Sequence, residues 1–177
     1  MKNNKKEYKN AKGGKHKMIK ISKFRDEYTN DVIDLVLHFQ NDGTRPPVSV
    51  NDRPDLLHIT EKYINVGGYF WIATDNGKSA GTIGVMPCND EVAVMKKFFI
   101  YEKYQSSPHH LGRKLYSYFL DFAKKNNYKT IMLDTPYNTT RAHKFYEKAG
   151  FIKVTEDELL IKFSHPYKDC DFFILNL

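Results

Sequence analysis

Several features that mark large classes of proteins are missing from this sequence of 177 residues. It contains only two cysteines, Cys88 and Cys170, without the spacing of a metal site, so a disulfide-rich scaffold is excluded. One disulfide between them stays open, although two free thiols in a reducing compartment fit better. The chain has no apolar run of about eighteen residues to span a membrane, and its N-terminus lacks the apolar stretch of a secretion signal. We therefore expect a cytoplasmic protein without a membrane partner.

Positive charge is concentrated at one end of the chain. Residues 1–17 hold seven lysines against one acid, Glu7, and so carry +6 of the net charge of +7. This segment is almost free of apolar residues and cannot bury enough surface to order itself. We expect a basic, flexible tail whose contact with RNA or anionic lipid would be weak and non-specific. The basic character therefore predicts no specific nucleic-acid partner.

Residues 18–177 predict one domain, with a core rich in its twelve phenylalanines and twelve tyrosines. Asn76 and Gly77 mark a hairpin between two strands, and no internal repeat occurs. The order of elements favours one α/β domain around a mixed sheet, with strands at 18–22, 69–74, 81–86, 92–100, 130–134, 151–154 and 171–177, and helices at 28–40, 55–63, 111–125 and 140–149. The last strand, Asp171–Leu177, could pair at a dimer edge, which leaves a homodimer possible.

Several local signals define these helices. Thr29 or Asn30 is expected to cap the first helix, and Asn51 or Asp52 to start the second. In the third helix an apolar stripe is predicted, formed by Leu111, Leu115, Tyr118, Phe119 and Phe122.

The segment 134–151 is the most informative part of the chain. Thr139 or Thr140 can cap its helix, and Gly150 stands where the backbone must turn left-handed before the strand that starts at Phe151. Taken alone, Tyr146 is most simply a half-buried aromatic with a wet hydroxyl. The basic residues of this helix are expected to face water: Arg141, Lys144 and Lys148.

A second informative segment, 97–115, is a strand that feeds a loop opening directly into a helix. The first N–H groups of a helix lack partners and bind phosphate, and Arg113 and Lys114 add positive charge there. The adjacent pair His109-His110 has no nearby cysteine or carboxylate cluster, so no metal site is predicted.

In this order the two segments resemble the GCN5-related N-acetyltransferase (GNAT) family. Gln105, Leu111 and Gly112 match the ends of that family's Gln/Arg-x-x-Gly-x-Gly/Ala motif, although the loop is two residues longer, lacks the early glycines and contains Pro108. The resemblance implies a single-domain GNAT-type α/β fold, in which helices flank a mixed, mostly antiparallel central sheet, and a site for acetyl-CoA. The later matches are Asp134-Thr135, Ala142, Phe145-Tyr146 and Gly150-Phe151.

The resemblance also assigns roles to single residues. Tyr146 would protonate the departing thiolate of coenzyme A. Asp134 is a candidate general base, although an aspartate that anchors a loop or caps a helix is the favoured interpretation; Asp90, Glu91 or ordered water are the alternatives. The residues implied to contact the coenzyme are Phe98, Phe99, Ile100, Gln105, Ser106, Ser107, His109, His110, Leu111, Gly112, Arg113, Lys114, Asn138, His143 and Tyr146.

The acceptor is less clearly indicated. Asp52 and Asp55 could hold a cationic amine and Arg53 a carboxylate, unless all three are solvated charges at a helix start. We expect acetyl-CoA-dependent acetylation of a primary amine, most simply of a small molecule, with a protein amine open. The alternative is a non-catalytic acyl-CoA-binding regulatory protein, because the strand position where many GNAT members place a glutamate reads Val94, Met95, Lys96 and Lys97.

Overall fold

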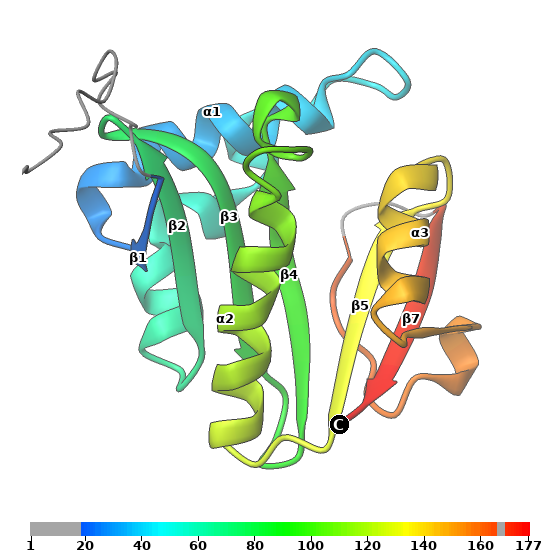
Figure 1. The fold of residues 1–177 in the computed structure, drawn as a ribbon. Coiled ribbons are helices and arrows are strands. Elements are labelled where there is room, and N and C mark those ends of the chain that lie inside the picture. Colours follow the sequence, from blue (N-terminus) through cyan, green and yellow to red (C-terminus); the bar gives the residue numbers. More distant parts are fainter. Residues whose placement is uncertain (1–18, 166–168) are drawn as a thin grey trace, which may run out of the picture.

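A computed structural model describes residues 19–165 and 169–177 (Figure 1), so the basic segment 1–17 lies outside the described residues. The described helices are α1 Thr29–Gln40, α2 Leu111–Lys125 and α3 Thr140–Lys148. The strands form one seven-stranded sheet and are β1 Lys20–Lys23, β2 Tyr69–Asp75, β3 Lys78–Pro87, β4 Val92–Ile100, β5 Thr130–Pro136, β6 Ile152–Val154 and β7 Cys170–Asn176.

The strand order in the sheet is β1-β2-β3-β4-β5-β7-β6, and every neighbouring pair is antiparallel except β4 and β5. This arrangement confirms the predicted α/β domain with a mixed, mostly antiparallel sheet. The predicted hairpin between β2 and β3 is also confirmed, because Asn76 and Gly77 form its two-residue turn with φ of 52° and 79°. Both angles are left-handed, as a turn with this twist requires.

One prediction about the sheet is wrong. The C-terminal strand β7 is not an edge strand, because it pairs with β5 on one side and with β6 on the other. Its Phe173 is fully buried, and residues 172–174 of the strand have a strand partner on both sides. The edges of the sheet are β1 and β6.

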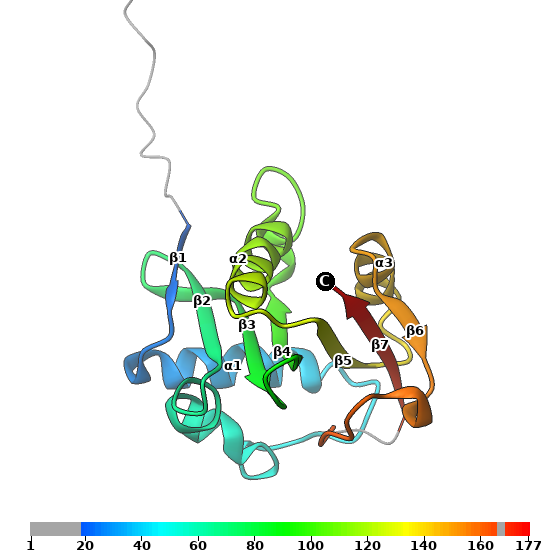
Figure 2. The same cartoon turned by 90° about the horizontal axis from the view of Figure 1, so that it is seen from below.

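Helices cover the two faces of the sheet (Figure 2): α2 and α3 lie on one face, and α1 with the segment that follows it lies on the other. The larger core lies beneath α2 and α3 and includes Trp71, Leu115, Phe119 and Phe173. A second core joins Val32 and Val36 of α1 to β2. The apolar faces of the helices therefore fix which side of the sheet each helix takes.

The predicted bounds of α2 are confirmed, but its buried face is rotated relative to the predicted stripe: Tyr116 belongs to it and Tyr118 does not. Tyr118 is 49% exposed, whereas Tyr116 is 8% exposed. The reason is the neighbouring helix α3, because the Tyr116 ring packs edge-on against Phe145 at a centroid distance of 5.4 Å. A stripe read from one helix alone cannot show a contact with a second helix.

The segment 55–63 does not form the predicted regular helix. It consists of a 3-10 turn, Pro54–His58, followed by a π-helical turn, Thr60–Ile64, in which the Asn65 N–H donates to the Thr60 carbonyl at 2.9 Å. The wider turn accompanies full burial of Tyr63, whose ring lies 5.1 Å from that of Phe70. Packing of this large ring against the sheet has overridden the simple helical pattern.

Thr139 occupies the predicted N-cap position of α3, but the predicted capping hydrogen bonds of the threonine hydroxyls are absent from α1 and α3. The hydroxyl of Thr29 donates to the Asp26 carbonyl at 2.7 Å, within a 3-10 turn that precedes α1. The hydroxyl of Thr139 donates to the Pro136 carbonyl at 2.6 Å, and neither helix has a side-chain cap. In contrast, Gly150 has the predicted left-handed backbone, with φ of 92°.

Candidate active site

The two parallel strands in the middle of the sheet separate along their length. Backbone pairing of β4 with β5 covers only Val92–Val94 opposite Thr130–Met132. Beyond these residues the strands diverge, as Figure 1 shows. The edge of β4 that faces β5 therefore has no strand partner from Met95 to Ile100, which leaves backbone donors and acceptors for a ligand.

A β-bulge lies within this free stretch of β4. The pairing of β3 with β4 shifts between Thr82 and Gly84, so that β4 carries one extra residue there. Lys97 in the bulge has a left-handed backbone with φ of 52°, and its carbonyl accepts a hydrogen bond from the Thr82 hydroxyl at 2.8 Å. A bulge of this kind redirects the side chains beside it, here those of Lys96 and Lys97.

A cavity of about 1400 Å³ occupies the space between the diverging strands. It extends from the segment after α1, past β4 and β5, to the N-termini of α2 and α3. Of the residues that the sequence singled out, those lining it are Asp52, Arg53, Asp55, Phe98, Phe99, Ile100, Gln105, Ser106, His110, Gly112, Arg113, Asp134, Asn138 and Tyr146.

Five of the predicted contact residues do not line this cavity. Ser107 and Lys114 are exposed, and Leu111 is fully buried in the core beneath α2. The ring of His109 packs against Tyr104 at 5.3 Å. His143 lies 3.2 Å from the Pro136 carbonyl through its Nε2 atom.

Tyr146 is 6% exposed and lines the cavity from α3. Its ring lies 5.9 Å from Phe145, 5.7 Å from Phe151 and 5.7 Å from Phe173. Burial, followed by the charge of Asp134, raises the pKa of Tyr146 well above its usual value. No hydrogen-bond partner for its hydroxyl is found in the described part of the chain. The residue therefore offers a protonated hydroxyl to a ligand in the cavity at any ordinary pH.

One end of the cavity is suited to phosphate groups. No acceptor among the described residues pairs with the N–H groups of Leu111 or Gly112 in the first turn of α2. A Cβ at Gly112 would stand 3.2 Å from the Ile100 side chain, so glycine lets the first turn of α2 pack closely against the end of β4. Arg113 lies beside these groups, and Arg141 of α3 donates to the Ser106 hydroxyl at 3.2 Å from the other side. Helix dipole and side-chain charge thus favour an anion at the same place.

In the loop 105–110, which precedes α2, several hydrogen-bond donors already have partners within the protein. The N–H groups of His109 and His110 both donate to the Ser106 carbonyl, at 3.0 and 2.9 Å. The Gln105 side chain donates to the Ile100 carbonyl at 2.7 Å and ties the loop to the end of β4. Since these groups are occupied, the anion-binding capacity of this end depends on the helix N-terminus and on side chains.

Three basic residues in this region were predicted only to face water. Arg141, Lys144 and Lys148 are exposed, but they also line the cavity. Their spacing of three and four residues places them on one side of α3. That spacing was visible in the sequence, but which side of α3 faces a cavity depends on the packing of the helix.

The other end of the cavity holds charged side chains that are largely buried. Lys96 forms an ion pair with Asp134 at 2.6 Å, and the two side chains are 15% and 7% exposed. Lys97 forms an ion pair with Asp55 at 2.9 Å, and the hydroxyl of Tyr63 donates to the same Asp55 oxygen at 3.0 Å. Asp134 is therefore not a helix cap: it neutralises a lysine of the adjacent strand.

The two neighbours of Asp55 in the predicted acceptor segment have different environments. Arg53 is 8% exposed and donates to the Gln40 side chain at 2.9 Å and to the Asp52 carbonyl at 2.7 Å. The exposed Asp52 carboxylate accepts from the N–H and hydroxyl of Ser49, at 2.7 and 2.8 Å, and these bonds lower its pKa. Arg53 is thus a buried cation in the cavity wall, whereas Asp52 caps a local turn.

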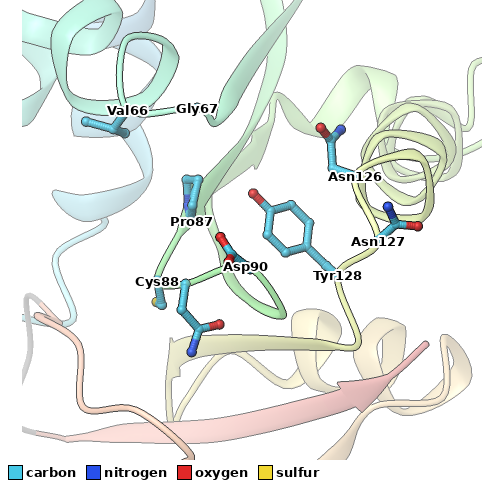
Figure 3. A pocket seen from close by; sticks show the side chains of 9 residues that line it. Val66, Gly67, Pro87, Cys88, Asp90, Asn126, Asn127 and Tyr128 are labelled. Atoms are coloured by element: carbon cyan, nitrogen blue, oxygen red, sulfur yellow. The ribbon is translucent and has the colours of Figure 1, made fainter.

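A smaller hollow of about 610 Å³ lies at the opposite end of β4 (Figure 3). It is formed where the β3–β4 turn meets the end of α2, and Tyr128, Asp90, Asn126 and Asn127 line it. It lies away from the N-termini of α2 and α3, and the buried ion pairs described above are not part of it.

Comparison with known proteins agrees with this architecture. The model of the acetyltransferase (GNAT) family matches residues 34–151, which span β4, α2, β5 and α3. A crystal structure of an acetyltransferase from Streptococcus agalactiae is 35% identical, has a TM-score of 0.85, and is matched over 90% of this chain and 98% of that one. The chain belongs to the GNAT acetyltransferase family.

Two further proteins extend the comparison. A probable N-acetyltransferase of Xenopus tropicalis, camello, is 29% identical over 118 residues, which are 65% of this chain and 52% of that protein. A protein of Salmonella typhimurium solved with its cofactor acetyl-CoA shares the fold, with 15% identity, a TM-score of 0.66, and coverage of 89% of this chain and 93% of that one. The chain spans about half the length of the curated relatives it matches. Within the described residues, no helix combines the length and hydropathy needed to cross a bilayer.

Proposed function

We propose that this protein transfers the acetyl group of acetyl-CoA to the primary amine of a small molecule, with Tyr146 as the general acid. The observation that carries the proposal is the buried Tyr146, which lines the same cavity as the free edge of β4. Acetyl-CoA is the co-substrate and supplies an activated acetyl group as a thioester. The phosphate-binding end at α2 and α3 suits its pyrophosphate, and the free backbone of β4 suits its pantetheine amides.

The residues of the chain have distinct tasks in this reaction. A backbone N–H of β4 near the bulge at Lys97 polarises the thioester carbonyl, as an oxyanion donor does. The amine nitrogen forms a bond to the acetyl carbon while the carbon–sulfur bond breaks. Tyr146 gives its proton to the leaving sulfur, and the proton lost by the amine returns through solvent, which restores the tyrosine. The proton transfers of this reaction therefore balance.

A dedicated general base is not required by this proposal. The two most buried carboxylates of the cavity, Asp55 and Asp134, are both engaged by lysines at 2.9 and 2.6 Å. Each would have to give up an ion pair in order to accept a proton, which is costly in a buried setting. Water in the open cavity therefore accepts the amine proton.

The shape of the acceptor end supports a small molecule rather than a protein chain. Buried charged groups, the ion pairs of Lys96 and Lys97, form its wall. Phe163 and Ser164, from the segment between β6 and β7, lie across β4 and β5 at the same end. The Lys96 ammonium donates to the Ser164 carbonyl at 2.9 Å and so holds that segment in place. Walls on several sides favour a compact acceptor over an extended peptide.

The proposal is tested with the full chain, acetyl-CoA and a panel of primary amines, by following release of the coenzyme thiol. Calorimetric titration with acetyl-CoA is run first, and we expect a dissociation constant in the micromolar range. Turnover with at least one small amine is the expected result. Tight binding of acetyl-CoA without thiol release on any amine or peptide would contradict catalysis, and would favour an acyl-CoA-binding regulatory protein.

A further inference from the structure

The chain between β6 and β7 crosses the sheet without regular structure. After the 3-10 turn Glu156–Glu158 it continues through residues 159–165, here called the crossing segment, on the face of the sheet opposite α2 and α3 (Figure 2). Every second side chain, those of Leu159, Ile161 and Phe163, packs against a small core formed by β4 and β5. Leu160 and Lys162, which lie between them, are exposed. The crossing segment is therefore an extended chain that lies on the sheet through one of its sides.

The backbone of the crossing segment has little support of its own. Within the described residues, no hydrogen bond joins the backbone of residues 160–164 to another backbone group. A side chain supplies one instead, because the Lys96 ammonium donates to the Ser164 carbonyl at 2.9 Å. Apolar packing is non-directional and does not by itself fix where an extended chain lies. The position of the segment at Ser164 therefore depends on Lys96.

Lys96 also holds the aromatic ring beside that carbonyl. Its ammonium lies 4.5 Å from the centroid of the Phe163 ring, and its ion pair with Asp134 at 2.6 Å ties it to β5. The Lys96 side chain is only 15% exposed, so water competes little with these contacts. Lys96 thus clamps the crossing segment to the two diverging strands, and its charge is used inside the protein.

Phe163 is the point at which this clamp meets the cavity. Phe163 lines the acceptor end together with Lys96, Asp134 and Ser164. Its ring also packs edge-on against Phe172 at a centroid distance of 6.2 Å. A large group on the acceptor would have to displace the ring, which would break its contacts with Lys96 and Phe172. The ring is therefore a fixed wall rather than a side chain that yields to a ligand.

Resting on the proposed function, we propose that Phe163 is the specificity-determining residue that limits the size of the acceptor amine, and that Lys96 is the positioning residue that holds Phe163 in place. The acceptor class is then small, unbranched primary amines rather than amines with a bulky group beside the nitrogen. Lys96 acts through the crossing segment and does not itself bind the acceptor.

The first test measures kcat/KM for primary amines of increasing bulk: ethylamine, isobutylamine and benzylamine. The wild-type full chain should prefer ethylamine. Phe163→Ala should lower the ratio of kcat/KM for ethylamine to that for benzylamine by about tenfold or more, since removal of a ring from a pocket wall admits a larger group. The KM for acetyl-CoA should not change.

Variants of Lys96 test whether it acts through the ring. Lys96→Met should shift the ratio in the same direction and raise the KM for ethylamine, whereas Lys96→Arg should keep most of the wild-type behaviour, because it retains a cation for Asp134 and for the ring. The double variant Lys96→Met/Phe163→Ala should shift the ratio no further than Phe163→Ala alone. Lys162→Met removes an exposed lysine of the same segment outside the cavity and is the matched control, which should leave the ratio unchanged.

A second test needs no substrate. Lys162 is an exposed trypsin site within the crossing segment, and cleavage there reports how readily the segment leaves the sheet. Mass spectrometry follows the fragment that ends at Lys162 during limited digestion of the full chain. The fragment should appear faster in Lys96→Met and in Phe163→Ala than in the wild type and in Lys96→Arg. Melting temperatures of all variants are measured alongside, so that loss of fold is recognised.

The outcomes keep this inference apart from the proposed function. Equal turnover of ethylamine and benzylamine by the wild type, or a wild-type ratio in a folded Phe163→Ala variant, would overturn the size limit and leave acetyl transfer intact. Cleavage at Lys162 that is equally slow in folded Lys96→Met would overturn the clamp.

Lys96→Met leaves the Asp134 carboxylate buried without its ion pair. If that variant does not fold, Phe163→Ala, which keeps the ion pair, decides both points through its amine ratio and its rate of cleavage. Binding of acetyl-CoA without turnover of any amine would remove the proposed function and the size limit with it, whereas the cleavage experiment would still support or overturn the clamp.

Discussion

Replacing Tyr146 by phenylalanine removes one hydroxyl and leaves the surrounding packing in place. The ring contacts with Phe145, Phe151 and Phe173 do not involve the hydroxyl, and no partner in the described residues loses a hydrogen bond. The free energy of unfolding should therefore change by less than about 1 kcal/mol. Affinity for acetyl-CoA should also be nearly unchanged, because the end of the cavity proposed to bind its phosphates lies at the N-termini of α2 and α3.

The effect on turnover should be much larger. A positioned general acid contributes about 10²- to 10⁴-fold, which corresponds to about 2.7 to 5.4 kcal/mol in the activation free energy. Because burial raises the pKa of Tyr146 above its ordinary value of 10, the wild-type hydroxyl stays protonated through the alkaline range. No fall in kcat below about pH 10 should come from this group.

The assay is steady-state thiol release over a range of pH, together with calorimetric binding of acetyl-CoA. The matched control is Tyr116→Phe, which removes another buried tyrosine hydroxyl outside the cavity and should leave kcat unchanged. A Tyr146→Phe variant that keeps full kcat at every pH would refute the general-acid role. An equal loss in both variants would point to a packing effect instead.

Three further predictions follow from particular residues. The Tyr116 hydroxyl is buried and has no hydrogen-bond partner in the described residues, so Tyr116→Phe should raise the free energy of unfolding by about 1 kcal/mol. Burial raises the pKa of Tyr116 to about 12, so the wild type loses stability as pH rises from 10 through about 12. The difference in melting temperature between the variant and the wild type should therefore be larger at about pH 11 than at about pH 8. Gly150→Ala should destabilise the protein by about 1 to 2 kcal/mol in chemical denaturation, because an alanine is strained at φ of 92°. Steric overlap adds nothing, since the new Cβ would lie at an ordinary contact distance of 3.5 Å from Leu175. An unchanged denaturation midpoint would show that this backbone relaxes. Arg141→Gln and Lys144→Gln should each weaken acetyl-CoA binding by about three- to tenfold at low salt, with the difference shrinking at high salt; affinity that does not respond to salt would place the phosphates away from α3.

Much of the secondary structure could be predicted from local signals. The turn at Asn76-Gly77, the glycine stop at Gly150 and the bounds of β4 and α2 follow from backbone preferences over a few neighbouring residues. The family resemblance depended on such short segments, in which one helix or one loop carries the pattern. Predictions that needed a second element were less successful, as Tyr116 in α2 and the inner position of β7 show.

The charged groups of the acceptor end could not be paired from the sequence. Two ion pairs form here, Lys97 with Asp55 and Lys96 with Asp134. They form because the β4 bulge and the π-helical turn bring distant segments into this register. Sequence spacing gives no information about such pairs, since side-chain direction at a bulge depends on the whole sheet. The sequence by itself therefore determined the local elements and the family pattern. Only the tertiary structure decided which charges became buried, because burial depends on segments that approach one another through the fold.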